Sequence, residues 1–321
     1  MSLIFNFNNI SFNSSLLILP FPSLSKIAKD NFNSSNSSGN KPASAVCSIT
    51  LAVACSVLFL TGANAQKRLT IIHFNDTHSH MEPERTGENA RHGGIIERAA
   101  YRDSVVKADG KKNVLMLHAG DFSQGTSYFT VLKGDLEIDM INAMRYDCVT
   151  LGNHEFDNGI EELGRRLANL KCPVVCANYD FSQFEVGNYV KPYAVVKKAG
   201  MRIGIIGLMP DITTLVSKET SSRIPAFDNA EVVNKWTKVL KEDEKCDLVI
   251  ALTHIGYEDE PYTDFDLVKS TRGLDIVVGG HSHTFIKKPG YETNLDGVPV
   301  PIVQNGCWGL EVGNMKVYKK K

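Results

Sequence analysis

The feature that most constrains the fold of this chain is an alternation of short apolar runs with longer amphipathic segments between Leu69 and Tyr318. The short runs are rich in Val, Ile and Leu and predict buried strands, whereas the amphipathic segments repeat apolar residues at helical spacing. The predicted strands are Leu69–Phe74, Asn113–Leu117, the run before Gly152, Val174–Ala177, Tyr193–Lys198, Met201–Met209, Asp247–Leu252, Leu274–Val278, Val300–Val303 and Val312–Tyr318. The predicted helices are Ile95–Val106, Leu136–Met144, Ile160–Leu170 and Ala230–Glu244. The pattern predicts one α/β domain with mixed strand directions, because Ala199-Gly200 joins two strands as a hairpin.

Composition adds little to this prediction. The chain has 321 residues, of which 43% are hydrophobic and 22% are charged, and a formal net charge of −1. These values are typical of a globular protein with a sizeable core. A charge so close to zero gives no reason to expect a nucleic-acid polymer or a membrane surface as partner.

The first part of the chain differs from the rest. Residues 1–45 are rich in Asn and Ser and predict a disordered extension, or a start codon placed too far upstream. Residues 46–65 then combine an apolar run with a small-residue end, Ala63-Asn64-Ala65, behind the basic Lys41. This combination is typical of a secretory signal peptide, and the run is shorter than the roughly 18 residues of a membrane span.

Cleavage after Ala65 would leave residues 66–321 as the mature domain, with no membrane span. The protein would be exported to the periplasm or the cell exterior, a choice that the signal alone leaves open. A lipid-modified Cys55 is the alternative, although apolar residues continue past it.

The remaining cysteines predict free thiols rather than a disulfide framework. They are odd in number and contain no C-x-x-C pair. Cys172 and Cys176 lie four residues apart on a predicted strand, about 13 Å, whereas a disulfide needs Cα atoms within about 7 Å.

The turn Thr150–Asp157 follows a predicted strand and precedes a predicted helix, where α/β proteins often present their chemistry. Asn153 offers a carbonyl oxygen to a metal ion. If the turn is helical, His154 and Asp157 are neighbours on one face. The carboxylate would then fix the imidazole tautomer and favour its protonated form, which suits a general acid or a cation that stabilises phosphate. Taken alone, the turn could equally be a polar helix cap.

Metal-capable side chains also follow four other predicted strands. The complete set is Asp76, His78, Asp121, Asn153, His254, His281 and His283. Ligands of open α/β sheets bind at this carboxyl edge, so these side chains are expected to meet. Mixed nitrogen and oxygen ligands suit Zn, Mn, Fe or Co better than Ca. The set is too large for one four-coordinate ion, and two divalent metal ions that share a carboxylate would use all of it.

With these motifs in place, FNDTHSH, AGDFSQGT, LGNHEFD, LTHIG and GGHSHT resemble the calcineurin-like metallophosphoesterases, in particular the N-terminal domain of the 5′-nucleotidase / 2′,3′-cyclic-nucleotide phosphodiesterase family. The resemblance implies a four-layer αββα sandwich with two mixed β-sheets. It also implies in-line attack of a metal-bound hydroxide on phosphorus, with His154, oriented by Asp157, stabilising the transition state or protonating the leaving oxygen. Asn153 and His154 would contact the substrate.

The same resemblance assigns the ligands to two ions. One ion would be held by Asp76, His78, Asp121 and His283, and the other by Asp121, Asn153, His254 and His281. Some nucleotidases have Gln where His283 stands, whereas His is common in the wider superfamily.

Two-domain nucleotidases hold the nucleotide with a C-terminal domain that has no counterpart in this sequence. We therefore expect either a separately encoded chain for nucleotide recognition or a domain that hydrolyses simpler phosphates alone. The expected activity is 5′-nucleotidase-like hydrolysis of phosphate monoesters. Alternatives are a 2′,3′-cyclic phosphodiesterase/3′-nucleotidase or broad phosphatase acting alone, a thiosulfate-ester hydrolase, and a non-catalytic metal-binding subunit.

The other histidines are expected to have lesser roles. His73 lies inside a predicted strand and is interpreted as a core residue. His118 either packs in the core or orients a metal ligand. His80 lies one strand alternation past His78 and is left out of the ligand set, and His92 is placed in a loop near the cleft.

Overall fold

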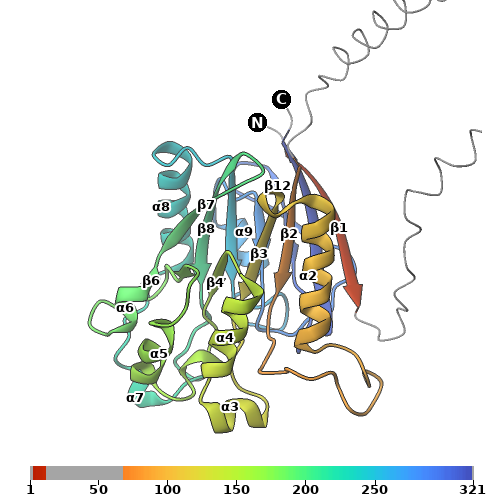
Figure 1. Cartoon of the computed structure of the whole chain (residues 1–321). Coiled ribbons are helices and arrows are strands. Elements are labelled where there is room, and N and C mark those ends of the chain that lie inside the picture. Colours follow the sequence, from red (N-terminus) through yellow and green to blue (C-terminus); the bar gives the residue numbers. More distant parts are fainter. Residues whose placement is uncertain (1–2, 12–67, 320–321) are drawn as a thin grey trace, which may run out of the picture. The chain divides into compact units, whose positions relative to one another are not determined.

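The structure, a computed structural model, describes residues 3–11 and 68–319 (Figure 1). The predicted signal peptide, residues 46–65, lies outside the described residues, as does most of the segment 1–45. Among the described helices, none is long and apolar enough to cross a membrane.

The described strands form two sheets. The seven-stranded sheet has the order β1-β13-β2-β3-β4-β5-β6, and the six-stranded sheet has the order β11-β12-β10-β9-β8-β7. The strands of the first sheet are β1 (Leu3–Ser11), β2 (Arg68–Phe74), β3 (Val114–Ala119), β4 (Cys148–Thr150), β5 (Val174–Val175), β6 (Val190–Lys191) and β13 (Glu311–Lys319). Those of the second are β7 (Tyr193–Lys198), β8 (Met201–Leu208), β9 (Leu248–Thr253), β10 (Ile276–Val278), β11 (Gly290–Thr293) and β12 (Pro299–Val303).

Both sheets are mixed, as the sequence predicted. In the first sheet β2 to β6 are parallel, and β13 is antiparallel to β2. In the second, β8, β9, β10 and β12 are parallel, and β7 and β11 are antiparallel edge strands. The hairpin between β7 and β8 turns at Ala199 and Gly200, whose φ angles of 50° and 67° suit a two-residue turn.

Helices cover the outer face of each sheet (Figure 1). The longer helices are α2 (Ile95–Asp109), α4 (Asp135–Met144), α5 (Ile160–Leu167) and α8 (Asn229–Glu242). The shorter ones are α3 (Ser127–Leu132), α6 (Val186–Tyr189), α7 (Lys218–Ser221) and α9 (Asp264–Lys269), with two 3₁₀ turns, η1 (Lys111–Asn113) and η2 (His154–Phe156).

Three apolar clusters lie between successive layers. One joins α2, α4 and α5 to the first sheet, one fills the space between the two sheets, and one joins the second sheet to α8 and α9. The middle cluster draws on both sheets, for example Leu117 of β3 and Ile250 of β9. The layers are therefore helix, sheet, sheet and helix, which is the predicted four-layer α/β sandwich.

Strand β1 corrects the prediction of a disordered extension for residues 3–11 alone, because Leu3–Ser11 pairs with β13 along its length. Leu3, Phe5 and Phe7 alternate with other residues and pack against the cluster between the sheets, whereas Ile4 is exposed. This period-two alternation is the signature of a half-buried strand. The Asn and Ser content of the segment obscured it in the sequence.

Candidate metal centre

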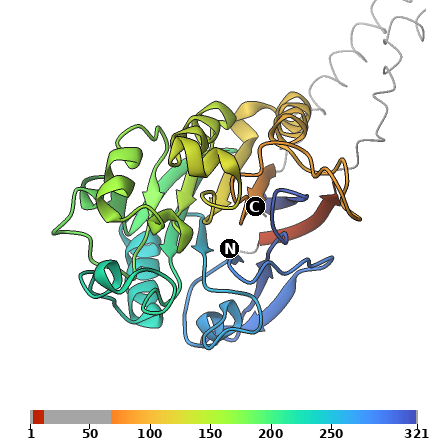
Figure 2. The same ribbon diagram turned by 90° about the horizontal axis from the view of Figure 1, so that it is seen from below.

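The loops that follow β2, β3, β4, β9 and β10 converge at the carboxyl ends of the parallel strands. Figure 2 views the described domain from this end. Since the two sheets pack face to face, loops from both reach the same place. Most of the side chains predicted as ligands lie there in two groups, one around Asp76 and one around Asp121, and a third group brings His154 together with His78 and Asp121.

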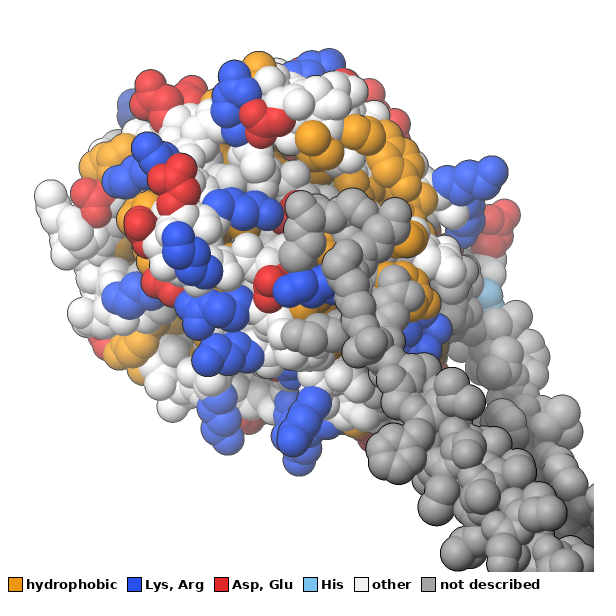
Figure 3. Space-filling view, turned by 90° about the horizontal axis from the view of Figure 1, so that it is seen from above, with side chains coloured by type: hydrophobic (Ala, Val, Ile, Leu, Met, Phe, Trp, Pro, Cys, Tyr) orange, Lys and Arg blue, Asp and Glu red, His pale blue; other side chains and the backbone are white. Residues whose placement is uncertain are grey.

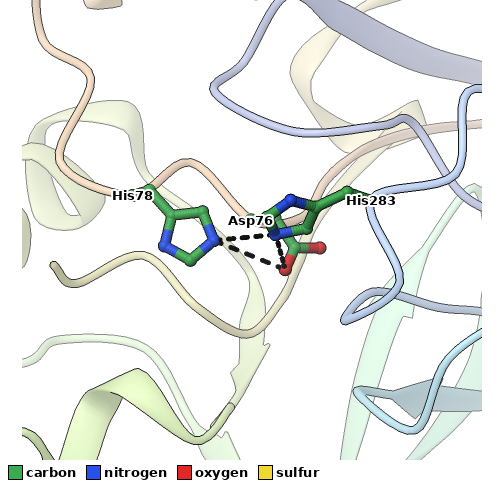
Figure 4. A group of neighbouring side chains, drawn as sticks. All are labelled: Asp76, His78 and His283. Atoms are coloured by element: carbon green, nitrogen blue, oxygen red, sulfur yellow. Dashed lines mark hydrogen bonds and ion pairs between the residues drawn. The ribbon is translucent and has the colours of Figure 1, made fainter. Parts of the chain in front are cut away.

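The first group contains Asp76, His78 and His283 (Figure 4). The Asp76 Oδ1 atom lies 3.2 Å from His283 Nε2 and 3.8 Å from His78 Nε2. The two imidazole Nε2 atoms are 2.9 Å apart. Two ring nitrogens and a carboxylate oxygen thus face one small volume, an arrangement suited to a divalent cation.

The second group contains Asp121, His254 and His281. His254 Nδ1 lies 2.6 Å from the carbonyl oxygen of Ala119, so Nδ1 must be the donor, and the ring directs Nε2 at the Asp121 carboxylate. That buried Nε2 has no hydrogen bond among the described residues and lies 3.0 Å from Asp121 Oδ2. Asp121 Oδ2 is also 3.9 Å from His78 Nε2, so this carboxylate links the two groups.

Asn153 contributes a further unsatisfied oxygen. Its Oδ1 atom is buried and accepts no hydrogen bond from the described residues. The next residue, His154, donates its backbone N–H to Asp121 Oδ1 at 2.9 Å. An orphaned buried oxygen normally carries a desolvation cost, and a metal ion would remove it.

The electrostatics of the protein groups favour a cation here. Burial acts to raise the pKa of Asp76. The interactions with His254 and His283 lower it by more, so the pKa of Asp76 lies below its usual value. Burial acts to lower the pKa of His254, yet the Asp121 and Asp76 carboxylates raise it to about 10. The two buried carboxylates therefore stabilise positive charge at this site, which His254 carries in the metal-free protein and a divalent ion could carry instead.

The backbone at the site is strained. Five of the seven predicted ligand residues have positive φ angles: Asp76 at 49°, His78 at 45°, Asp121 at 50°, His281 at 84° and His283 at 54°. Non-glycine residues rarely adopt this conformation, and it concentrates at functional sites. Gly152 is also required, because a Cβ there would clash with the Asp121 carboxylate.

Glu155 ties two of the loops together. Its buried carboxylate accepts backbone N–H hydrogen bonds from Asp121 at 2.9 Å, Ser123 at 3.0 Å and Gly152 at 2.6 Å. Beneath it, the fully buried Arg166 donates to the Glu155 carbonyl oxygen at 2.6 Å and to Ser123 Oγ at 3.0 Å. Sequence reasoning missed both residues; the only signals were a charge next to Asn153-His154 and an arginine in an otherwise apolar helix face.

Asn75 positions the first group. Its Nδ2 atom donates to Asp76 Oδ2 at 2.7 Å and to the Gly306 carbonyl oxygen at 2.6 Å, and its Oδ1 accepts from Asn305 N–H at 2.9 Å. Asn305 in turn contacts His73 Nδ1 at 2.8 Å. The loop before β13 thereby fixes Asp76, a link that sequence reasoning did not find.

His154 and Asp157 form the expected pair. His154 is the first residue of the 3₁₀ turn η2 and Asp157 directly follows the turn, and His154 Nδ1 lies 2.9 Å from Asp157 Oδ2. The hydrogen bond that His154 donates to Asp157 raises the pKa of His154, even though partial burial opposes this. The His154 ring is 5.3 Å from the His78 ring, so the pair lies beside the first group of candidate ligands.

The remaining histidines lie outside the two groups described above. Burial lowers the pKa of both His73 and His118 to about 3, so both are neutral. His80 stacks on Trp308 and lies 2.6 Å from Glu84 Oε1. His92 lines a separate cavity of about 240 Å³. Within the described residues the cysteines are free thiols, as predicted.

The fold and the two groups of side chains define an α/β protein with a candidate centre for two metal ions. A family model described as calcineurin-like phosphoesterase matches residues 69–285. The chain belongs to this family.

Known proteins agree with that assignment. The chain is 35% identical over 272 residues to an apyrase of Tabanus yao, covering 78% of this chain and 48% of the apyrase. It is 33% identical over 306 residues to the 5′-nucleotidase of Homo sapiens, covering 86% of this chain and 50% of that protein. The solved structure of a 5′-nucleotidase precursor from Thermus thermophilus superimposes with a TM-score of 0.69 at 34% identity, covering 78% of this chain and 51% of that one. The chain thus spans about half the length of the relatives it matches.

Proposed function

We propose that this domain is a metal-dependent phosphoesterase that hydrolyses phosphate monoesters, with nucleotides as the first candidates. One observation carries the proposal: the Asp121 carboxylate lies between two groups of metal-capable side chains, 3.9 Å from His78 of the first group, and the His154–Asp157 pair lies beside them. A site built only to hold metal for stability would not require a partly exposed imidazole paired with a carboxylate at its edge.

We assign the predicted ligands to two ions that share one carboxylate. The first ion would be held by Asp76, His78, Asp121 and His283, and the second by Asp121, Asn153, His254 and His281. When bound, two divalent ions polarise phosphate oxygens and activate water for attack. Zn, Mn, Fe and Co all suit this mixture of nitrogen and oxygen ligands.

His154 carries the proton chemistry of the chain itself. Asp157 fixes Nδ1, so the Nε2 atom of the protonated ring is free to donate to a phosphate oxygen or to the leaving oxygen. Asn153 and His154 are assigned as substrate contacts, because the turn that holds them adjoins both the bridging Asp121 and the solvent.

The nucleotide substrate is supported by the names of the relatives, a 5′-nucleotidase and an apyrase. Because the match covers only about half of each relative, we propose that nucleotide recognition requires a second domain or a separately encoded chain that corresponds to the unmatched half. Hydrolysis of 2′,3′-cyclic or simple phosphate esters by this domain alone is the alternative.

We also propose export to the periplasm or the cell exterior, from the signal-peptide pattern in residues 46–65.

Phosphate release from AMP and from an aryl phosphate, with Mn or Zn added, tests the proposal. The expected result is metal-dependent cleavage of the aryl phosphate, with faster AMP cleavage once the recognition domain is supplied. His154→Ala should keep the metal content and lower turnover by roughly 10²–10⁴-fold. A metal-loaded wild-type protein that cleaves neither ester would support a non-catalytic metal-binding role instead.

A further inference from the structure

A second cavity lies away from the candidate metal centre, between α2 and α4, where β3 and β4 begin. Its volume is about 490 Å³, within the range of roughly 300–1,000 Å³ that is usual for small-molecule sites. Val114 and Met116 of β3 form part of its floor, whereas the opposite end of β3 leads to Asp121. No residue assigned to the metal centre lines it.

The walls carry an excess of positive charge. Two of the cationic side chains are paired, Lys198 with Asp147 at 2.8 Å and Arg102 with Asp103 at 3.0 Å. The other three are Lys111, Arg145 and Lys171, and none of them forms an ion pair with a carboxylate in the described part of the chain. Figure 3 views the end of the molecule where β2 begins and shows many Lys and Arg side chains there.

The floor of the cavity is apolar. Besides Val114 and Met116, it includes Ile141, Met144 and the partly buried Cys172. Burial raises the pKa of the Cys172 thiol to about 12, so this side chain adds no negative charge at neutral pH. An apolar floor under three cations without carboxylate partners fits a ligand that carries separate anionic groups on a hydrocarbon body.

We propose that this cavity binds a small organic polyanion, with an aromatic or alicyclic body that covers the apolar floor and two or three anionic groups that pair with Lys111, Arg145 and Lys171. The shared chemistry is that of aromatic di- and tricarboxylates, disulfonates and aryl phosphates. Each of the three cationic residues is solvent-exposed, so each ion pair is modest, and affinity depends on several acting together.

Titration calorimetry of the full chain with naphthalene-1,5-disulfonate tests the site. Sulfonates are poor metal ligands and cannot be hydrolysed by a phosphoesterase, so the result is independent of the proposed function. We expect saturable one-to-one binding that weakens as salt is added. The double variant Lys111→Gln/Lys171→Gln should weaken it tenfold or more.

Lys112→Gln is the matched control, because Lys112 lies next to Lys111 on η1 but does not line the cavity. It should bind the probe as the wild type does, and all three proteins should have the same melting temperature. The uncharged naphthalene-1,5-diol should bind at least tenfold more weakly than the disulfonate. Equal binding by wild type and double variant, equal binding of the diol, or no binding at millimolar probe in low salt would each overturn the proposal.

Discussion

At the scale of single residues, the candidate metal centre depends on residues that are not themselves candidate ligands. Glu155 is the strongest case, because three backbone N–H groups from two loops converge on one carboxylate. Glu155→Gln would replace one carboxylate oxygen by an NH₂ group, which cannot accept a hydrogen bond. At least one buried N–H would lose its partner, at a cost of about 1–3 kcal/mol.

We therefore expect Glu155→Gln to lower phosphate release by about 10–100-fold, in line with other residues that orient metal ligands. The assay is phosphate release at saturating Mn, together with metal content. Glu162→Gln on α5 is the control, because the Glu162 carboxylate pairs with the surface residue Arg165. A Glu155→Gln enzyme with wild-type turnover and metal content would show that the three hydrogen bonds do not position Asp121.

Asp157 allows a prediction about pH. Its hydrogen bond raises the pKa of His154, so the protonated ring persists to higher pH and is lost as pH rises through that pKa. If the protonated form is the active one, activity falls at alkaline pH. Asp157→Asn keeps a hydrogen-bond acceptor but removes the charge, so the alkaline limb of the kcat profile should move to lower pH.

The comparison is a kcat profile from pH 5 to about 10, with Asp139→Asn on the exposed face of α4 as the control. The control profile should coincide with that of the wild type. An unchanged alkaline limb in Asp157→Asn would remove His154 from the proton chemistry.

At the scale of elements, the long apolar runs were predictable and the short elements were not. Strands such as β2, β3 and β9 are almost entirely buried, so hydrophobicity alone defines them. By contrast, α3, α6, α7 and α9 span only four to six residues each, too few for an apolar repeat at helical spacing to be recognised in the sequence. Strand β1 was missed because its partner β13 lies at the other end of the chain.

The candidate site also contains residues that could be predicted from the sequence and residues that could not. The order of metal-capable residues at strand ends was readable, because parallel strands present their carboxyl ends at one edge. Glu155, Arg166, Asn75 and Asn305 were not, because each acts on a group from a distant segment. Hydrogen bonds of that kind have no sequence periodicity.

The hydrogen bond between Thr253, which ends β9, and Asp264, which begins α9, supports a prediction about stability. Asp264 is buried, accepts a hydrogen bond from Thr253 Oγ1 at 2.6 Å, and has no partner for Oδ2 among the described residues. Burial raises its pKa to about 7, so the folded state binds a proton that the unfolded state releases near pH 4. The unfolded state thus binds fewer protons in this interval, and stability is lost as pH rises from about 4 to about 7.

Asp264→Asn is neutral throughout and should not undergo this loss. Relative to the variant, the wild type should lose about 1.4 kcal/mol of unfolding free energy per pH unit across the interval. Urea unfolding at several pH values, with a chelator present, measures the difference. A difference between the two proteins that stays constant with pH would place the Asp264 pKa near its ordinary value.

At the scale of the whole molecule, the candidate ligands join two sheets that meet mainly through apolar packing. Asp76, His78, Asp121 and Asn153 follow strands of the first sheet, whereas His254, His281 and His283 follow strands of the second. A bound ion would tie the sheets together at one end and relieve the repulsion between the buried Asp76 and Asp121 carboxylates.

Metal binding should therefore stabilise the entire domain, and not only the loops. A ligand present at 100 times its Kd adds about 2.7 kcal/mol for one site, so the chelated protein should melt several degrees below the Mn- or Zn-loaded protein. Asp121→Asn removes the shared charge and should abolish most of this difference, whereas Asp139→Asn should preserve it. Thermal unfolding of the three proteins, each with chelator and with metal, provides the test. Equal metal-dependent stabilisation of Asp121→Asn and wild type would mean that Asp121 does not bridge two ions, and the ligand assignment would have to be redrawn around separate sites.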